Sequence, residues 1–242
     1  MLNKCPSMHM LRPISIVIAF AVLIGLVDMP RAWAGDGVCN PNADYFLGTE
    51  NYVQAIASHR RLIVLQPDNA LAHYHLGFAY GMTGNRAQEL VEYRKAAALG
   101  LRQWDIYLNL GRALLESGDL PGATDALTTA VALGPDHPES HFNLGLAYER
   151  RGILPAAREQ MAASLKLDPN QPDARNMLGL IYAEADDYSH ARQIWTELVR
   201  AQPDFDPARR NLAILDRMVG GPDREHAPDI RELRTASATD PR

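Results

Sequence analysis

The stretch that decides the fold is HFNLGLAYERRGILPAAREQMAASLKLDP, residues 141–169. One dipeptide in it, Leu144-Gly145, recurs along the chain at a constant spacing of 34 residues. The other copies are Leu76-Gly77, Leu110-Gly111 and Leu178-Gly179, and Leu212-Ala213 continues the series. A fixed period of this length predicts an array of structural repeats, each too small to bury its own apolar face.

Four further positions recur with the same step. The columns are Tyr80, Leu114, Tyr148 and Tyr182; Gly84, Gly118, Gly152 and Asp186; Ala55, Glu89, Ala123, Ala157 and Ala191; and Pro67, Leu101, Pro135, Pro169 and Pro203. Each leucine and the residue four positions later share one face of a helix. The glycine beside the leucine allows a second helix to approach closely, and the later glycine suits a turn with positive φ. Because the proline ends the second helix, each repeat is predicted to be a helical hairpin.

The pattern resembles the tetratricopeptide repeat (TPR) family, whose helix–turn–helix unit carries Trp-x2-Leu-Gly-x2-Tyr, Ala-x3-Phe and Pro. The resemblance implies an all-α fold, a right-handed α-solenoid of stacked TPR helix–turn–helix repeats over residues 35–218. Complete repeats are expected at about 70–103, 104–137, 138–171 and 172–205. A partial repeat with a degenerate first helix is expected at about 42–69, and a capping helix at 206–218. Residues 219–242, rich in breakers and mixed charge, are expected to form a flexible C-terminal tail.

Residues 1–34 have the three parts of a secretory signal peptide. Lys4 and Arg12 form the positive start, an apolar run follows at 14–27, and Ala32-Trp33-Ala34 supplies a cleavage site. Export is therefore expected, with the periplasm as the destination and secretion as the alternative, and the mature chain would begin at Gly35. Two other readings stay open. One is an uncleaved anchor, although a membrane span needs about 20 apolar residues, and the other is a lipoprotein acylated at Cys39.

Composition narrows the classes of function. The chain is 47% hydrophobic and 22% charged, which is typical of a globular protein and excludes a multi-span membrane protein. Its formal net charge is −5, so it lacks the basic excess with which proteins bind nucleic acid. Of its two cysteines, only Cys39 remains once the signal is removed, which excludes a disulfide-dense scaffold.

Candidate catalytic and metal-binding residues are few. The sequence contains no Gly-rich phosphate loop, no Gly-x-Ser-x-Gly, no His-Glu-x-x-His and no Cys-x-x-Cys. His73 and His75 are two apart on a predicted helix and point about 200° apart, and Pro138 separates His137 from His141. We therefore expect no catalytic residue, no metal site and no cofactor, and hence no enzyme. His73 and His141 stand where the family often has tryptophan, which predicts a packing role.

The resemblance also implies a binding surface. In the family, the first helices of successive repeats line a concave groove that binds extended or helical peptides. Aromatic and aliphatic side chains would supply burial, asparagines would bond the ligand backbone, and arginines would meet a carboxylate. Members that hold a C-terminal carboxylate of chaperone tails use lysines that this chain lacks, so that partner class is not expected. By register the groove residues are Tyr74, His75, Phe78, Leu108, Asn109, Arg112, Phe142, Asn143, Leu146, Arg150, Asn176, Met177, Leu180 and Asn211.

Three hypotheses for the function follow. The chain is an exported interaction module that binds a protein or peptide partner in the groove, without chemistry. Alternatively, it is an assembly scaffold that self-associates or docks into an envelope complex through its ends. The third alternative is a thiol-dependent factor or enzyme centred on Cys39. None of the three involves nucleic acid or a membrane span after signal cleavage, and none fixes the oligomeric state.

Overall fold

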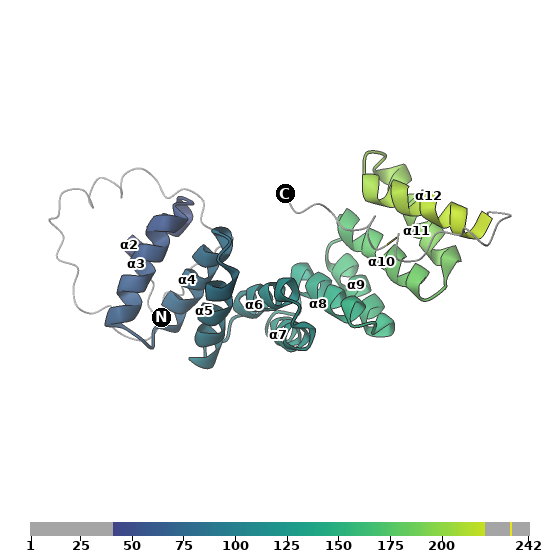
Figure 1. The fold of residues 1–242 in the computed structure, drawn as a ribbon. Coiled ribbons are helices and arrows are strands. Elements are labelled where there is room, and N and C mark those ends of the chain that lie inside the picture. Colours follow the sequence, from purple (N-terminus) through teal and green to yellow (C-terminus); the bar gives the residue numbers. More distant parts are fainter. Residues whose placement is uncertain (1–40, 221–232, 234–242) are drawn as a thin grey trace. The chain divides into compact units, whose positions relative to one another are not determined.

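The computed structural model describes residues 41–220 and 233, and within these residues it contains eleven helices and no strand (Figure 1). The predicted all-α fold is confirmed. The predicted signal peptide, Cys39 and all of the predicted tail except residues 219, 220 and 233 lie outside the described residues. Among the helices of this part of the chain, none combines the length and the apolar character that a membrane span requires.

Contacts divide the chain into two compact units, residues 1–102 and 103–242. Within each unit, every described helix packs against the next one in the chain. The first unit contains α2 (Pro41–Gly48), α3 (Tyr52–Leu65), α4 (Ala70–Met82) and α5 (Arg86–Ala98). The second contains α6 (Trp104–Ser117), α7 (Leu120–Leu133), α8 (Pro138–Arg150), α9 (Leu154–Leu167), α10 (Pro172–Glu184), α11 (Tyr188–Ala201) and α12 (Asp206–Gly220). Each expected complete repeat therefore contains one helix pair.

In each of the four complete repeats, one buried side chain on the second helix fits against the glycine of the first helix. A Cβ built on Gly179 would lie 2.5 Å from Nε1 of Trp195, and one built on Gly111 would lie 2.4 Å from Cγ of Leu127. We call these second-helix side chains the knob residues, and they recur every 34 residues as Tyr93, Leu127, Met161 and Trp195. All four are at most 1% exposed. The helices of a pair can approach this closely only because no side chain stands opposite the knob.

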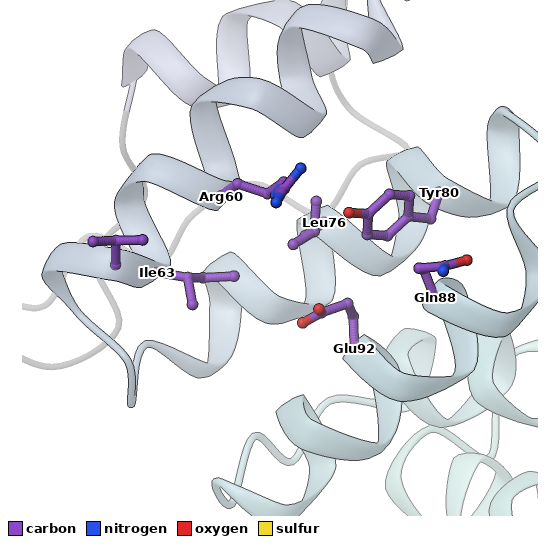
Figure 2. A pocket seen from close by; sticks show the side chains of 7 residues that line it. Arg60, Ile63, Leu76, Tyr80, Gln88 and Glu92 are labelled. Carbon is purple, nitrogen blue, oxygen red and sulfur yellow. The ribbon is translucent and has the colours of Figure 1, made fainter.

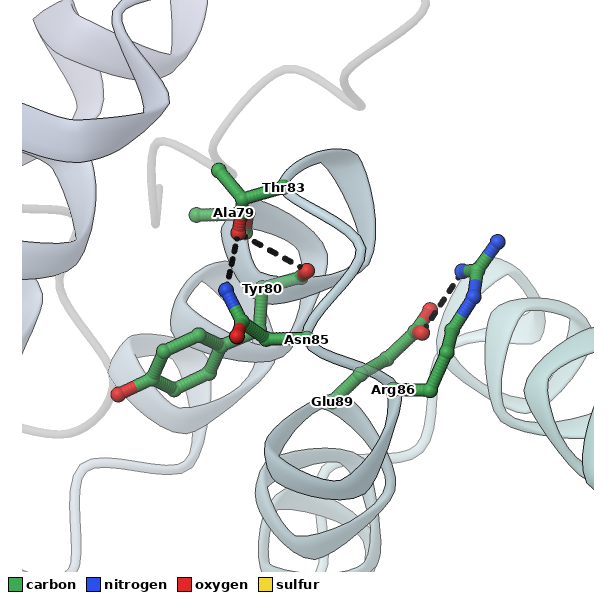
Figure 3. Close-up of polar contacts among 6 residues, drawn as sticks. All are labelled: Ala79, Tyr80, Thr83, Asn85, Arg86 and Glu89. Carbon is green, nitrogen blue, oxygen red and sulfur yellow. Dashed lines mark hydrogen bonds and ion pairs between the residues drawn. The ribbon is translucent and has the colours of Figure 1, made fainter.

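The turns inside the repeats use the left-handed backbone region, as the glycine column predicts. Gly118 ends α6 with φ 82°, and Asp186, which replaces glycine in the same column, has φ 58°. The turn between α4 and α5 adds side-chain bonds (Figure 3). There the Thr83 hydroxyl donates to the carbonyl of Ala79 at 3.1 Å and accepts from Asn85 Nδ2 at 2.8 Å. These bonds hold the entry to α5 in place.

Polar side chains in the column of the family tryptophan join one repeat to the next. Nε2 of His141 lies 3.0 Å from the carbonyl oxygen of Pro135, and its Nδ1 lies 2.8 Å from Oε1 of Gln160. His73 makes the equivalent contacts with Pro67 and Glu92, at 3.0 and 2.6 Å. Both histidines are buried, so their predicted packing role is confirmed.

The C-terminal end of the second unit is closed by α12. Its Ile214 and Leu215 face a core cluster with Trp195 and Leu198, while Asp216 and Arg217 are exposed. Leu233, within the sequence predicted to be a flexible tail, is fully buried in the same cluster. The last helix thus has the apolar inner side and polar outer side of a terminal unit.

Candidate functional site

The predicted groove residues of the second unit fall into three groups. Arg112 and Arg150 are exposed, and four side chains are buried: Leu108, Asn176, Leu180 and Asn211. The remaining five are partly buried: Asn109, Phe142, Asn143, Leu146 and Met177. In the first unit, Tyr74 and His75 are buried and Phe78 is partly buried. Only part of the predicted set is therefore available at the surface.

The buried members of the set pack between helices. Asn211 Nδ2 donates to Oδ1 of Asn176 at 2.8 Å, and the Asn176 carbonyl accepts from Nε1 of Trp195 at 3.2 Å. Tyr74 lies against Tyr93 with ring centroids 5.8 Å apart. Since the two asparagines bond each other across α10 and α12, they stabilise the fold and are not open to a ligand backbone.

The accessible members form what we call the first-helix face of the second unit, comprising Asn109, Arg112, Phe142, Asn143, Leu146, Arg150 and Met177. Phe142, Leu146 and Met177 pack against one core cluster and keep part of their surface exposed. The Arg150 guanidinium donates to the carbonyl of Leu115 at 3.1 Å, which holds this side chain across from α8 to α6. The face thus combines apolar surface with two exposed cations and amide groups.

A hollow of about 490 Å³ lies in the first unit among α3, α4 and α5 (Figure 2). Its lining combines Ile63, Val64 and Leu76 with polar side chains from Arg60, Tyr80, Gln88 and Glu92. Glu92 is already bonded to His73, at 2.6 Å. The lining thus offers apolar surface together with single polar groups.

A second site in the first unit joins three helices through Asp44 of α2, His59 of α3 and His75 of α4. Oδ1 of Asp44 lies 2.8 Å from Nδ1 of His75 and 3.7 Å from Nε2 of His59. The two imidazole rings meet edge to face with centroids 5.2 Å apart. One ligand atom from each of the three residues lies within 4.8 Å of the other two. Residues from separate helices therefore converge on one small volume.

The state of His59 is unusual for a histidine. Its side chain is 1% exposed, and neither ring nitrogen has a hydrogen-bond partner among the described residues. Burial, reinforced by the neighbouring His75 and opposed by Asp44, lowers the pKa of His59 to about 4. Leaving a buried polar group unsatisfied costs about 1–3 kcal/mol, so His59 is retained at a cost to stability.

Comparison with known families decides the identity of the fold. A family model described as "Tetratricopeptide repeat" matches residues 108–172 and 155–204, and one described as "TPR repeat" matches residues 47–84. The chain belongs to the tetratricopeptide repeat family. No curated protein matches the chain.

Several solved structures resemble the chain in fold. One, described as "YrrB: a TPR protein with an unusual peptide-binding site", is 25% identical, with a TM-score of 0.66, and the match covers 69% of this chain and 86% of that one. The PilF structure from Pseudomonas aeruginosa is also 25% identical, with a TM-score of 0.60 and coverages of 81% and 84%. A MamA structure at 22% identity and a TM-score of 0.62, with coverages of 66% and 88%, supports the fold alone.

The TPR register shows what the sequence prediction missed in the first unit. His59 stands at the phenylalanine of the Ala-x3-Phe pattern, 34 residues before the knob residue Tyr93. Asp44 falls in the column of Phe78 and Leu146, and His75 in the column of Asn109 and Asn143. The prediction of no metal site compared histidines within one helix and found His73 and His75 pointing apart. Extending the columns back to the partial repeat would have exposed the departures at Asp44 and His59, and His75 departs from its column in the first complete repeat.

Proposed function

We propose that this TPR protein is a non-catalytic interaction module that binds a peptide segment of another protein on the first-helix face. The observation that carries the proposal is the face itself, where partly exposed apolar side chains on α8 and α10 lie among exposed arginines and amides. Mixed surfaces of this kind are typical of protein interfaces, in which apolar burial is combined with a few directed polar contacts. The resemblance to YrrB, described as having a peptide-binding site, supports the same class of ligand.

The chemistry of the face defines the expected ligand. Arg112 and Arg150 favour a peptide with a carboxylate, because guanidinium groups bind carboxylates through charge-assisted hydrogen bonds. Asn143 offers an amide for the peptide backbone, although its Nδ2 already donates to the carbonyl of Glu139 at 2.8 Å. Phe142 and Met177 supply apolar contact. An acidic, partly apolar peptide segment fits this set of groups.

The proposal is tested by selecting peptides from a displayed library on the immobilised wild-type chain and measuring their affinity for two variants. The first variant, Arg112→Glu with Arg150→Glu, reverses both charges of the face, and the selected peptides should lose at least tenfold in affinity. The matched control, Arg151→Glu with Lys166→Glu, makes the same change in charge at two exposed residues outside the face. The control should bind within twofold of the wild type.

The other functions are outcomes of the same experiment. If both variants bind the selected peptides with equal affinity, this result would contradict peptide binding on the first-helix face. It would favour docking through the ends of the array. Loss of binding in a Cys39→Ser variant alone would favour the thiol-dependent alternative.

We also propose that the protein works outside the cytoplasm, in the periplasm or as a secreted protein. The support is the charged start, apolar run and Ala32-Trp33-Ala34 of residues 1–34. N-terminal sequencing of the protein from its native cell should give a chain beginning at Gly35. A chain that retains residues 1–34 would contradict cleavage, and its recovery from the cytoplasm would contradict export.

A further inference from the structure

Three side chains of types that ligate metals meet where the first helix pair, α2 and α3, packs against α4. In the other helix pairs the knob position holds Tyr93, Leu127, Met161 or Trp195, all buried against the neighbouring helix. In the first pair it holds His59, which is equally buried and has no hydrogen-bond partner among the described residues. A hydrophobic side chain would fill this position without leaving buried nitrogens unpaired, so packing alone does not account for the histidine.

The neighbours of His59 complete a set of donors. Oδ1 of Asp44 lies 3.7 Å from Nε2 of His59 and 2.8 Å from Nδ1 of His75, and the three ligand atoms lie within 4.8 Å of one another. In a tetrahedral zinc site, ligands about 2.0–2.2 Å from the metal are separated by about 3.4 Å. Small rotations of side chains therefore bring the three atoms to bonding distance from one ion.

We propose that Asp44, His59 and His75 bind a divalent transition-metal ion, with Zn²⁺ as the ion that fits the donors best. Two imidazoles and one carboxylate are ligands that Zn²⁺ takes in proteins, whereas Mg²⁺ and Ca²⁺ prefer all-oxygen sets. The ion would lie between Nδ1 of His75 and Oδ1 of Asp44 and would replace their direct contact of 2.8 Å. His59 is available as a ligand, because neither of its buried ring nitrogens has a hydrogen-bond partner among the described residues.

The site has both a sheltered side and an open side. The His59 side chain is 1% exposed, whereas that of Asp44 is 20% exposed, so an ion would enter past the carboxylate. Three protein ligands leave the fourth tetrahedral position to water or to a donor from a partner. Since the ligands come from α2, α3 and α4, the ion would fasten the eight-residue α2 to the two helices that follow it.

The test is a zinc titration by calorimetry on the full mature chain under reducing conditions, with His59→Leu as the diagnostic variant. This variant should fold, because leucine occupies the same column at Leu127. The wild type should bind one Zn²⁺ per chain. His59→Leu should bind that ion at least about 100-fold more weakly, since removing outer-shell partners alone costs 10–100-fold in affinity.

His73→Asn is the matched control, because His73 is also buried beside a carboxylate in the first unit but has both ring nitrogens engaged. It should retain the wild-type affinity. Two further readouts belong to the metal alone. Co²⁺ should give the intense visible absorption of a four-coordinate site in the wild type and in His73→Asn but not in His59→Leu, and Zn²⁺ should slow hydrogen exchange at the amides of α2.

The outcomes separate this proposal from the peptide-binding function. A wild type that binds no Zn²⁺, or that binds it equally well after His59→Leu, would overturn the metal site. Neither result would affect peptide binding on the first-helix face, which belongs to the second unit and is measured with different variants.

Discussion

At the scale of single residues, the fold depends on what stands opposite each knob residue. Trp195 is fully buried, and its ring lies where a side chain on Gly179 would begin. Met161 meets Gly145 in the same way, but there the nearest atom is the flexible terminal methyl Cε. The two glycines occupy equivalent positions and differ in the rigidity of the neighbouring side chain.

Gly179→Ala is therefore expected to lower the free energy of unfolding by about 1–3 kcal/mol, the typical cost of overpacking a filled core. The added Cβ would lie 2.5–3.0 Å from three atoms of the Trp195 indole, which cannot bend away. Gly145→Ala should cost less, because Met161 can change rotamer and alanine favours a helix. Urea denaturation followed by circular dichroism measures the free energy of unfolding of both variants. Equal losses in the two would contradict the idea that the rigidity of the side chain facing the glycine sets the cost.

The lowered pKa of His59 makes the stability of the metal-free first unit depend on pH. Histidine in an unfolded chain has a pKa near 6.5 and the folded-state pKa is about 4, so between these values only the unfolded chain binds the proton. The contribution of neutral His59 is therefore fully present above pH 6.5 and is lost as the pH falls toward 4. His75 and Asp44 are the titratable groups that face it.

Lowering the pH from 7 to 5 in the presence of EDTA should cost the first unit about 2 kcal/mol through His59. His59→Leu should remove this part of the loss. Hydrogen exchange at the amides of α3, measured for wild type and variant at both pH values, reports the difference. The same pH sensitivity in both proteins would contradict the assignment to His59.

At the scale of the helices, hydrogen bonds between neighbouring repeats explain why polar residues occupy the column in which the family often has tryptophan. His141 connects the start of α8 to the carbonyl of Pro135 and to Gln160 of α9. Arg175 reaches the equivalent carbonyl of Pro169 through Nη2 at 2.7 Å. These bonds satisfy carbonyls at the ends of the second helices, where no intrahelical donor is available.

His141→Phe is expected to destabilise the chain by about 1–3 kcal/mol, because it leaves the Pro135 carbonyl and the Gln160 amide without their partner. His190→Phe is the control, since His190 bonds Asp187 at 2.6 Å but is exposed, and exposed pairs contribute about 0–1 kcal/mol. Chemical denaturation at pH 7 compares the two. A larger loss of unfolding free energy in His190→Phe than in His141→Phe would contradict a stabilising role for the hydrogen bonds of His141.

Sequence periodicity could predict the helix pairs because each column records a packing requirement that recurs unchanged. One such requirement is the close packing of Met161 against Gly145, which follows Leu144 in the chain. Sequence periodicity could not distinguish the exposed from the interhelical members of the predicted groove residues, because Asn143 and Asn211 occupy the same column. Asn143 is partly exposed on α8, whereas Asn211 is buried against Asn176. The meeting of Asp44, His59 and His75 depends on the packing of three helices, and no motif of fixed spacing describes it.

At the scale of the whole molecule, the two units differ in their number of helix pairs. The second contains three pairs and α12, and the first contains α2 to α5. Repeat arrays need about three repeats for stability, and domains of about 60 residues commonly need a metal or another constraint. The second unit therefore has enough repeats to be stable through packing alone. In the first unit, which has fewer repeats, a bound ion would add most to stability.

A fragment of residues 103–242 is accordingly expected to fold alone, with a helical circular dichroism spectrum and one cooperative thermal transition. A fragment of residues 35–102 should be less stable and should gain in Tm when Zn²⁺ is added. An unfolded 103–242 fragment would contradict the division into units. A Tm that is higher for the 35–102 fragment than for the 103–242 fragment would contradict the prediction that the first unit is the less stable one.

The central claim is that a peptide binds across the first helices of the second unit. Hydrogen exchange of the full mature chain, with and without the tightest peptide selected from the library, measures this directly. We predict that the peptide slows exchange in α6, α8 and α10 and leaves α7, α9 and α11 within error. Protection confined to the second helices, or to the first unit, would contradict the claim.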